Sequence, residues 1–328
     1  MGMRVLVTGA TGKVGQHLLP ALRAKYPGSA LELVLLCNNR VPEDAPHQTI
    51  VRGSISDRAV VREAMRNVTH IIHMSAVKEN PDLAMDVSVK GMFWMLEEFR
   101  AAPTGEQFIL IGGDCSVGHI LQHYDAPITE DSPRKPYPGC YALSKVLEET
   151  MLEQYYIQYG LNGCCLRAPW IMEKDDFKYA MTFGPDQFGG PAWNDLLSEH
   201  EIARYAKENR VPLLLDHDGQ PLKRSFVHVS DLVSAIVAAL DNPKAHQQLF
   251  NVSMNAPVEY AKIADHLEKT RGLKPVKINS NFYSNWLSNS KARLLLDWEP
   301  KVELTELIEE SYTFQRDASD PRKIWYVG

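Results

Sequence analysis

The sequence predicts an α/β protein with a doubly wound parallel sheet and a smaller C-terminal lobe. Two observations carry this prediction. Short apolar runs alternate with longer helical repeats through the first 170 residues, and a glycine-rich turn directly follows the first apolar run. Strands separated by crossover helices form parallel sheets. The 328-residue chain is therefore expected to divide into a main domain at 1–170, with returns at about 225–253, and a lobe that takes up most of 171–328.

The elements of the main domain follow from apolar runs and from residues that begin or end helices. Strands are predicted at 4–8, 31–37, 49–52, 70–74, 108–111 and 163–167. Helices are predicted at 13–26, 57–65, 87–101 and 141–159. Asp57 is a plausible N-cap for the second helix, and Gly160 is expected to stop the fourth.

The pattern loosens after Pro169. Charged residues, glycines and prolines mix at 173–195 with Phe183, Phe188 and Trp193. These aromatic side chains either line a pocket or build the core of the lobe. Helices are predicted at 195–208, 229–240, 260–271 and 304–314, and strands at 212–215 and 249–252.

Composition and charge argue against several classes of protein. The 35 basic and 41 acidic residues leave a formal charge of −6, and no basic stripe points to nucleic acid. No apolar run reaches the ~18 residues of a membrane helix, and no secretory leader precedes the first strand. The five cysteines are too few and too irregularly spaced for a disulfide framework or a zinc site. We therefore expect a cytoplasmic enzyme with no metal, membrane or nucleic-acid partner.

The glycine-rich turn lies between the first strand and the first helix and reads Thr8-Gly9-Ala10-Thr11-Gly12-Lys13-Val14-Gly15. Gly9 permits a tight turn, Gly12 lets backbone N–H groups approach a pyrophosphate, and Gly15 lets the helix pack closely on the sheet. The helix N-terminus favours the anion. This context predicts a dinucleotide site that includes Thr11, Lys13 and Val14.

The glycine spacing and four later motifs together resemble one family. The motifs are Tyr141-Ala-Leu-Ser-Lys145, Arg224-Ser-Phe-Val-His-Val-Ser-Asp231, Phe250-Asn-Val-Ser and the stretch from Ser290 to Pro300. In this order, they resemble the extended branch of the short-chain dehydrogenase/reductase superfamily, which contains NAD-dependent epimerases and dehydratases. The resemblance implies a Rossmann-like fold and hydride transfer at a hydroxyl-bearing carbon of a carbohydrate-derived substrate.

The choice between NAD and NADP depends on the end of the second strand. An acid that would hold the adenosine ribose of NAD is missing there, and Asn38 and Arg40 follow the strand instead. Arg40 could bind the 2′-phosphate of NADP, so NADP is slightly favoured over NAD. Asn38 could still form a hydrogen bond with the ribose. The resemblance implies further cofactor contacts at Ser54, Ile55, Met74, Ser75, Ala76 and Pro169.

Tyr141 and Lys145 are the expected proton-transfer pair. They lie four residues apart on a predicted helix, so both face the same way. A free tyrosine has a pKa near ~10, so a base active near neutrality needs a shift of about three units, or roughly 4 kcal/mol. The resemblance assigns that shift to the Lys145 ammonium and the positive nicotinamide. It also has Lys145 bond the nicotinamide ribose. The alternative is that Tyr141 and Lys145 are ordinary surface residues of a helix with no role in proton transfer.

The sequence departs from the family pattern at the third catalytic position. Relatives carry Ser or Thr where this chain has Gly113, and that hydroxyl orients the substrate and stabilises the developing alkoxide. Ser116 or Asp114 could substitute if the loop has a different shape. Asp114 matches the first proton-transfer acid of the dehydratases, but Cys115 replaces the second, which argues against dehydration.

The substrate lobe departs as well. Trp170 stands near a position where relatives often place an asparagine that contacts the phosphates of a nucleotide sugar. Arg224 matches a diphosphate-binding position, or it could pair with an acid such as Asp231. The leading hypothesis is therefore an NAD(P)-dependent dehydrogenase or reductase that acts on a smaller or atypical sugar-like substrate. A nucleotide-sugar epimerase that retains NAD is one alternative, and a catalytically weak NAD(P)-binding redox sensor is another.

Relatives commonly dimerise through the helices equivalent to 87–101 and 141–159, so a homodimer is expected. Eight apolar or aromatic residues could form the interface, or could simply cover the sheet. They are Met92, Met95, Leu96, Phe99, Leu152, Tyr155, Tyr156 and Tyr159.

Overall fold

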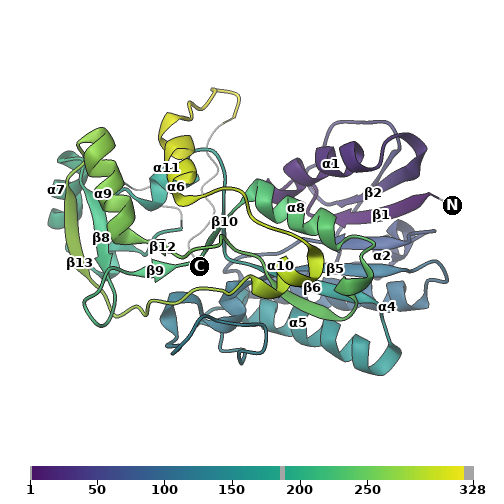
Figure 1. The fold of residues 1–328 in the computed structure, drawn as a ribbon. Helices are drawn as coiled ribbons and strands as arrows, with labels where there is room; N and C mark the ends of the chain where they lie inside the picture. Colours follow the sequence, from purple (N-terminus) through teal and green to yellow (C-terminus); the bar gives the residue numbers. More distant parts are fainter. Residues whose placement is uncertain (1, 185–188, 321–328) are drawn as a thin grey trace.

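A seven-stranded parallel sheet forms the centre of the molecule in the computed structural model, which describes residues 2–184 and 189–320 (Figure 1). The strand order is β11-β6-β5-β4-β1-β2-β3. The strands are β1 (Met3–Thr8), β2 (Leu31–Cys37), β3 (Gln48–Arg52), β4 (His70–His73), β5 (Gln107–Gly113), β6 (Gly163–Ala168) and β11 (Gln248–Asn251). The register pairs Thr8 with His73 and Gly113 with Ala168, so the carboxyl ends of these four strands lie at one edge.

Helices cover both faces of the sheet, as the alternating pattern predicts. One face carries α1 (Lys13–Lys25), α8 (Val229–Ala239) and α10 (Ser290–Leu296), and the other carries α2 (Arg58–Ala64), α4 (Gly91–Ala101) and α5 (Cys140–Tyr159). Figure 1 shows α1 and α8 on one side of the strands and α4 and α5 on the opposite side. The doubly wound fold class is therefore confirmed.

Local signals explain where most helices begin and end. Asp57 caps α2 by accepting from Ala59 N at 2.8 Å. Gly160 ends α5 in the left-handed conformation, with φ 62°. The helix expected at 195–208 is shorter, because a capping box between Ser198 and Glu201 starts α7 (Glu199–Lys207) after a separate turn at Trp193–Asp195.

The helix expected at 87–101 begins earlier than predicted. Asn80 accepts a hydrogen bond from Leu83 N and so caps α3 (Pro81–Leu83). A wider helical segment, η2 (Ala84–Lys90), then leads into α4. Most of the residues expected at a dimer interface on α4 and α5 are core residues instead. Met92, Met95, Leu96, Phe99, Leu152 and Tyr155 are buried against the sheet.

The lobe contains short strands and four helices among the described residues. The strands are β7 (Trp170–Met172), β8 (Val211–Leu215), β9 (Lys223–Arg224), β10 (Phe226–His228), β12 (Val258–Glu259) and β13 (Pro275–Asn279). The helices are α6 (Asp176–Ala180), α7, α9 (Tyr260–Arg271) and α11 (Leu304–Thr313). Phe183 and Trp193 are buried in the core of the lobe and are not among the residues that line the cavity described below, and Phe188 lies outside the described residues.

The described residues contain neither a candidate membrane-spanning helix nor a candidate metal-binding cluster. No helix there has the length and apolar character needed to cross a bilayer. Over the same residues, no group of His, Cys, Asp and Glu has the arrangement of a metal site.

Candidate active site

The carboxyl ends of β1, β4, β5 and β6 open onto a cavity of about 510 Å³ between the sheet and the lobe. The walls on the sheet side include the glycine turn, Gly113, Tyr141 and Lys145. Trp170, Asp195, Arg224 and Phe282 line it from the lobe side. The structure therefore brings the predicted dinucleotide turn, the predicted acid/base pair and the two predicted substrate residues to one place.

The glycine turn has the close approaches that a phosphate cradle requires. Gly9 has φ +72°, and a Cβ there would lie 3.1 Å from the carbonyl carbon of Met74. A Cβ at Gly15 would lie only 2.4 Å from the Ala10 carbonyl oxygen, so only glycine lets α1 pack this closely. The helix begins after Gly12 with no side-chain cap. Its first N–H groups thus remain available to an anion, which fits a dinucleotide pyrophosphate.

A threonine hydroxyl links the end of β1 to the loop that follows β4. Thr8 Oγ1 accepts from Met74 N at 3.1 Å and from Ser75 N at 3.2 Å. Met74 and Ala76 line the cavity, whereas Ser75 is not among the lining residues and holds the loop through its backbone. Beneath this loop, burial lowers the pKa of His73 to about 3, and the neutral ring contacts Thr8 Oγ1 at 2.9 Å.

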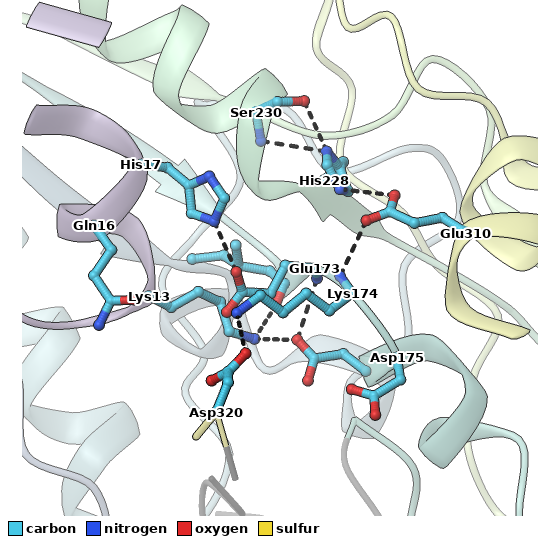
Figure 2. A network of polar contacts seen from close by, with 12 residues as sticks. Lys13, Gln16, His17, Glu173, Lys174, Asp175, His228, Ser230, Glu310 and Asp320 are labelled. Carbon is cyan, nitrogen blue, oxygen red and sulfur yellow. Dashed lines mark hydrogen bonds and ion pairs between the residues drawn. The ribbon is translucent and has the colours of Figure 1, made fainter. Parts of the chain in front are cut away.

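Lys13 ties the glycine turn to the lobe. Its Nζ donates to Ile171 O at 2.9 Å and forms an ion pair with Asp176 on α6. Figure 2 shows Lys13 among a wider network, in which His17 on α1 contacts Glu173 at 2.7 Å. Further along this network, Glu310 on α11 accepts from Lys174 N at 3.1 Å. The two parts of the molecule are thus joined by charged contacts beside the cavity.

The predicted adenosine contacts lie apart from this cavity. Asn38 and Arg40 are exposed after β2, and neither they nor Thr11 line the cavity. Ser54 Oγ bonds Ser56 Oγ at 2.8 Å, and Ile55 is buried in the core. The cavity therefore extends from the phosphate turn to the acid/base pair and the lobe, but not to these five residues.

Tyr141 and Lys145 both line the cavity, but the pair is not arranged as expected. Lys145 Nζ donates to Glu148 Oε2 at 2.7 Å and to Ile111 O at 3.1 Å. Burial raises the pKa of Tyr141 well above 10, and the negative charges of Glu148 and Asp114 raise it further. The Glu148 carboxylate thus pairs with the ammonium that is expected to favour the Tyr141 phenolate.

Lys78 is a functional candidate that the sequence analysis missed. Its Nζ lies 3.7 Å from the ring centre of Tyr141 and 5.7 Å from that of Trp170. Burial lowers the pKa of Lys78 to about 8, so the side chain is still largely charged at neutral pH. The only available signal was its position two residues after Ala76, in the segment already assigned to the cofactor.

The two candidates for the missing hydroxyl have different positions. Ser116 is fully buried, and its Oγ lies 2.9 Å from both Glu149 Oε1 and Gly113 O, so it does not reach the cavity. Asp114 does line the cavity, and its Oδ2 lies 2.7 Å from His119 Nδ1. The structure therefore removes Ser116 from the site and leaves Asp114.

Arg224 contacts His119 rather than Asp231. Its Nη2 can only donate, so the Nε2 of His119 accepts and Nδ1 carries the proton towards Asp114. Arg224 Nη1 donates to Gly189 O at 2.7 Å. Asp231 instead accepts from Lys301 N and Val302 N, both at 3.0 Å, so the expected alternative pairing is wrong. Sequence reasoning also missed His119, which connects a cavity acid to a cavity arginine.

Residues 5–253 match the model of the NAD dependent epimerase/dehydratase family. The chain belongs to this family. Membership of the epimerase/dehydratase family, expected from the motifs, is thereby confirmed.

Relatives with different reactions resemble the chain to a similar degree. UDP-glucuronate 4-epimerase 1 of Arabidopsis thaliana is 26% identical over 86% of this chain and 67% of its own length. The mitochondrial L-threonine 3-dehydrogenase of Bos taurus is 26% identical over 96% of this chain and 83% of its own. The chain spans 62% of the length of another relative, UDP-glucuronate 4-epimerase 6 of Arabidopsis thaliana.

Solved structures support the fold. A short-chain dehydrogenase/reductase superfamily protein from Agrobacterium tumefaciens with bound NAD superposes with a TM-score of 0.77 at 21% identity, covering 94% of this chain and 96% of that one. UDP-glucuronic acid 4-epimerase from Bacillus cereus in complex with NAD gives a TM-score of 0.71 at 20% identity, covering 94% and 97%. These family structures contain NAD, and nothing in the comparisons supports the expected lean to NADP.

Gly113 faces the hydroxyl group of Tyr141. A Cβ at Gly113 would lie 3.8 Å from Tyr141 Oη and 3.0 Å from Cys115 Sγ. The Cys115 thiol therefore fills much of the space beside the missing side chain. Burial raises its pKa to about 12, so it remains a neutral thiol and a weak hydrogen-bond donor.

Proposed function

We propose that the chain is an NAD(P)-dependent oxidoreductase that moves hydride to or from a hydroxyl-bearing carbon of a small carbohydrate-derived substrate. One observation carries the proposal: Tyr141, Lys145 and the Gly9–Gly15 turn line a single cavity. The family and both groups of relatives, epimerases and a dehydrogenase, are compatible with this chemistry.

The residues of the chain would divide the work as follows. A bound nicotinamide would supply or accept the hydride. Tyr141 Oη exchanges a proton with the oxygen of the reacting carbon. Lys145 Nζ has one N–H beyond its two bonds, to Glu148 and Ile111, and it can direct this towards a ribose hydroxyl. Lys78 places positive charge against the ring of Tyr141, which favours the phenolate when it must form.

The substrate end of the cavity favours a compact polar molecule. Trp170 forms a flat apolar wall there, while Asp114, Asp195 and Arg224 supply polar groups. The charge of Arg224 is already partly balanced by Asp114 through His119. This argues for a substrate with hydroxyl groups or a single negative charge rather than a diphosphate.

A nucleotide-sugar epimerase that retains NAD is the second candidate. It is supported by Arg224 on the cavity wall and by the UDP-glucuronate 4-epimerases among the relatives. A catalytically weak redox sensor is a third, favoured by Gly113 but opposed by Tyr141 and Lys145 at the cavity.

Identifying the bound dinucleotide separates these candidates. Freshly purified protein is denatured, and any released dinucleotide is identified by mass. Stoichiometric NAD or NADP would favour the epimerase, because such a cycle regenerates its cofactor in place. Empty protein that turns over NAD(P) in a screen of sugars and sugar acids would support the proposed oxidoreductase. Failure of every substrate with every cofactor would contradict both.

A homodimer through α4 and α5 remains part of this proposal, with a different set of contact residues. Phe93 on α4 and Leu143, Ile157 and Tyr159 on α5 are exposed apolar or aromatic side chains, and Ile157 is 69% exposed. Light scattering of the purified chain should give twice the monomer mass. Ile157→Lys should return it to a monomer, and an unchanged mass in that variant would contradict the assignment.

A further inference from the structure

A buried carboxylate lies behind the catalytic lysine. Glu148 is 0% exposed and Lys145 is 3% exposed, and their side chains meet at 2.7 Å. Glu148 Oε1 has no hydrogen-bond partner among the described residues. Tyr141, Lys145 and Glu148 have the i, i+4, i+7 spacing of one helix face, so this carboxylate continues the line of the proton-transfer pair.

The adjacent carboxylate is bound in a different way. Glu149 accepts from Arg167 Nη2 at 2.8 Å and from Arg134 Nε at 3.1 Å. Two guanidinium groups therefore balance the charge of Glu149, whereas Lys145 is the one cation in contact with Glu148 within residues 2–184 and 189–320. The Lys145–Glu148 pair is electrically neutral as a unit.

We propose that Glu148 is a positioning residue that cancels the charge of Lys145 and keeps Tyr141 as a protonated phenol, ready to donate to a substrate carbonyl. The resting site is thereby set for reduction. A bound NAD(P)H would supply hydride to the carbonyl carbon, and Tyr141 Oη would give its proton to the carbonyl oxygen. The resulting phenolate regains a proton from water. This inference rests on the proposed oxidoreductase function and adds a preferred direction to it.

The other charged or titratable groups around Tyr141 act on its pKa in both directions. Lys78, from the loop after β4, is the second cation, and its Nζ lies over the Tyr141 ring. Asp114 and Cys115 from the turn after β5, and Tyr137 from the loop before α5, all raise the pKa of Tyr141 further. Glu79 raises the pKa of Lys78 and so helps to keep it charged.

Two buried groups near Lys145 are neutral. Burial keeps the His73 ring unprotonated near neutral pH, and it raises the pKa of the Cys165 thiol well above 9. Glu148 is therefore the carboxylate that determines how much of the Lys145 charge reaches Tyr141. Removing it would leave two cations, Lys78 and Lys145, beside one phenol.

The experiment is a titration of the Tyr141 phenolate. Tyrosinate absorbance is recorded against pH for the full chain and for Tyr141→Phe, and the difference isolates Tyr141. The pair is then repeated in a Glu148→Gln background. We expect the midpoint to fall by about one pH unit or more, because an unscreened ammonium favours the phenolate. The matched control is Glu153→Gln, a half-exposed glutamate on the same helix, which should leave the midpoint unchanged.

An unchanged midpoint in Glu148→Gln would overturn the proposal. If that variant does not fold, Glu148→Met gives the same comparison with an apolar side chain of similar size, and the same outcomes apply. The titration needs neither substrate nor cofactor, so it is independent of the proposed function. A shifted midpoint in a chain that turns over no substrate would sustain the role of Glu148 in Tyr141 ionisation and contradict only the oxidoreductase assignment.

Discussion

The hydroxyl of Tyr141 lies 3.8 Å from the point at which a side chain on Gly113 would begin. A serine there would direct its Oγ towards the reacting oxygen that Tyr141 serves. The same point is 3.0 Å from Cys115 Sγ, which is tighter than ordinary packing. The absence of a side chain at Gly113 and the presence of the Cys115 thiol beside it are therefore linked, because the thiol occupies the space that a larger residue at 113 would need.

Restoring the hydroxyl should therefore raise the rate. In the double variant Gly113→Ser/Cys115→Ala, the smaller residue at 115 gives the new Oγ room, and kcat should rise by about tenfold or more through stabilisation of the developing alkoxide. Gly113→Ala/Cys115→Ala is the control, with the same packing and no hydroxyl. Equal kcat values in the two double variants would show that this position does not serve the reaction.

Tyr141→Phe should lower kcat by at least about 10²-fold, because Tyr141 is the group proposed to exchange a proton with the substrate oxygen. Dinucleotide binding, followed by fluorescence of the reduced cofactor, should persist. Tyr159→Phe removes a hydroxyl from a half-exposed tyrosine on the same helix and should have wild-type kinetics. Undiminished turnover by Tyr141→Phe would assign the proton transfer to a different residue.

Lys78→Met should shift the pH profile of alcohol oxidation upwards. The ammonium over the Tyr141 ring favours the phenolate, so its removal raises the pH at which the base forms. Lys90→Met, at an exposed position on η2, provides the comparison. Identical acid limbs for Lys78→Met and the parent would show that Lys78 does not act on the ionisation of Tyr141.

His73 should make the free energy of unfolding depend on pH. Its folded-state pKa is about 3 against an ordinary 6.5, so below about pH 6 the unfolded chain takes up a proton that the folded chain does not. Stability contributed by the neutral ring is complete above pH 6.5 and falls by up to roughly 1.4 kcal/mol per pH unit as the pH drops towards 3.

Urea unfolding of His73→Asn between about pH 6 and pH 4 checks this expectation. The variant should be less stable than the parent near neutrality but should lose less stability on acidification. His123→Asn, at an exposed site, should keep the slope of the parent. Parallel slopes for His73→Asn and the parent would contradict the assignment.

The success of the sequence-based predictions depends on how local the deciding interactions are. The end of α5 was predictable because Gly160 itself adopts the left-handed conformation that stops a helix, and Tyr260–Arg271 matches its prediction because Gly272 does the same. The contact between His119 and Arg224 joins residues 105 positions apart. It also requires the left-handed backbone of His119, at φ 49°, which no local pattern indicates.

The other differences between the sequence-based predictions and the structure arise from the burial of particular side chains. Ser116 is two residues from the cavity acid Asp114, but its hydroxyl binds the buried Glu149 instead. Glu148 was visible in the sequence three residues after Lys145, yet a helical glutamate is ordinarily solvated. Only the three-dimensional packing shows that it is buried and paired with the lysine.

The outermost strand of the sheet has a consequence for how the protein is made. β6 ends at Ala168, but its partner β11 begins at Gln248, after the ribosome has delivered much of the lobe. Until then a nascent chain presents β6 as an open edge with unpaired N–H and C=O groups, the kind of surface that recruits strands from other chains. The covering helices α8 and α10 also come late. We therefore expect a chain that ends before β11 to aggregate rather than to fold into a stable cofactor domain.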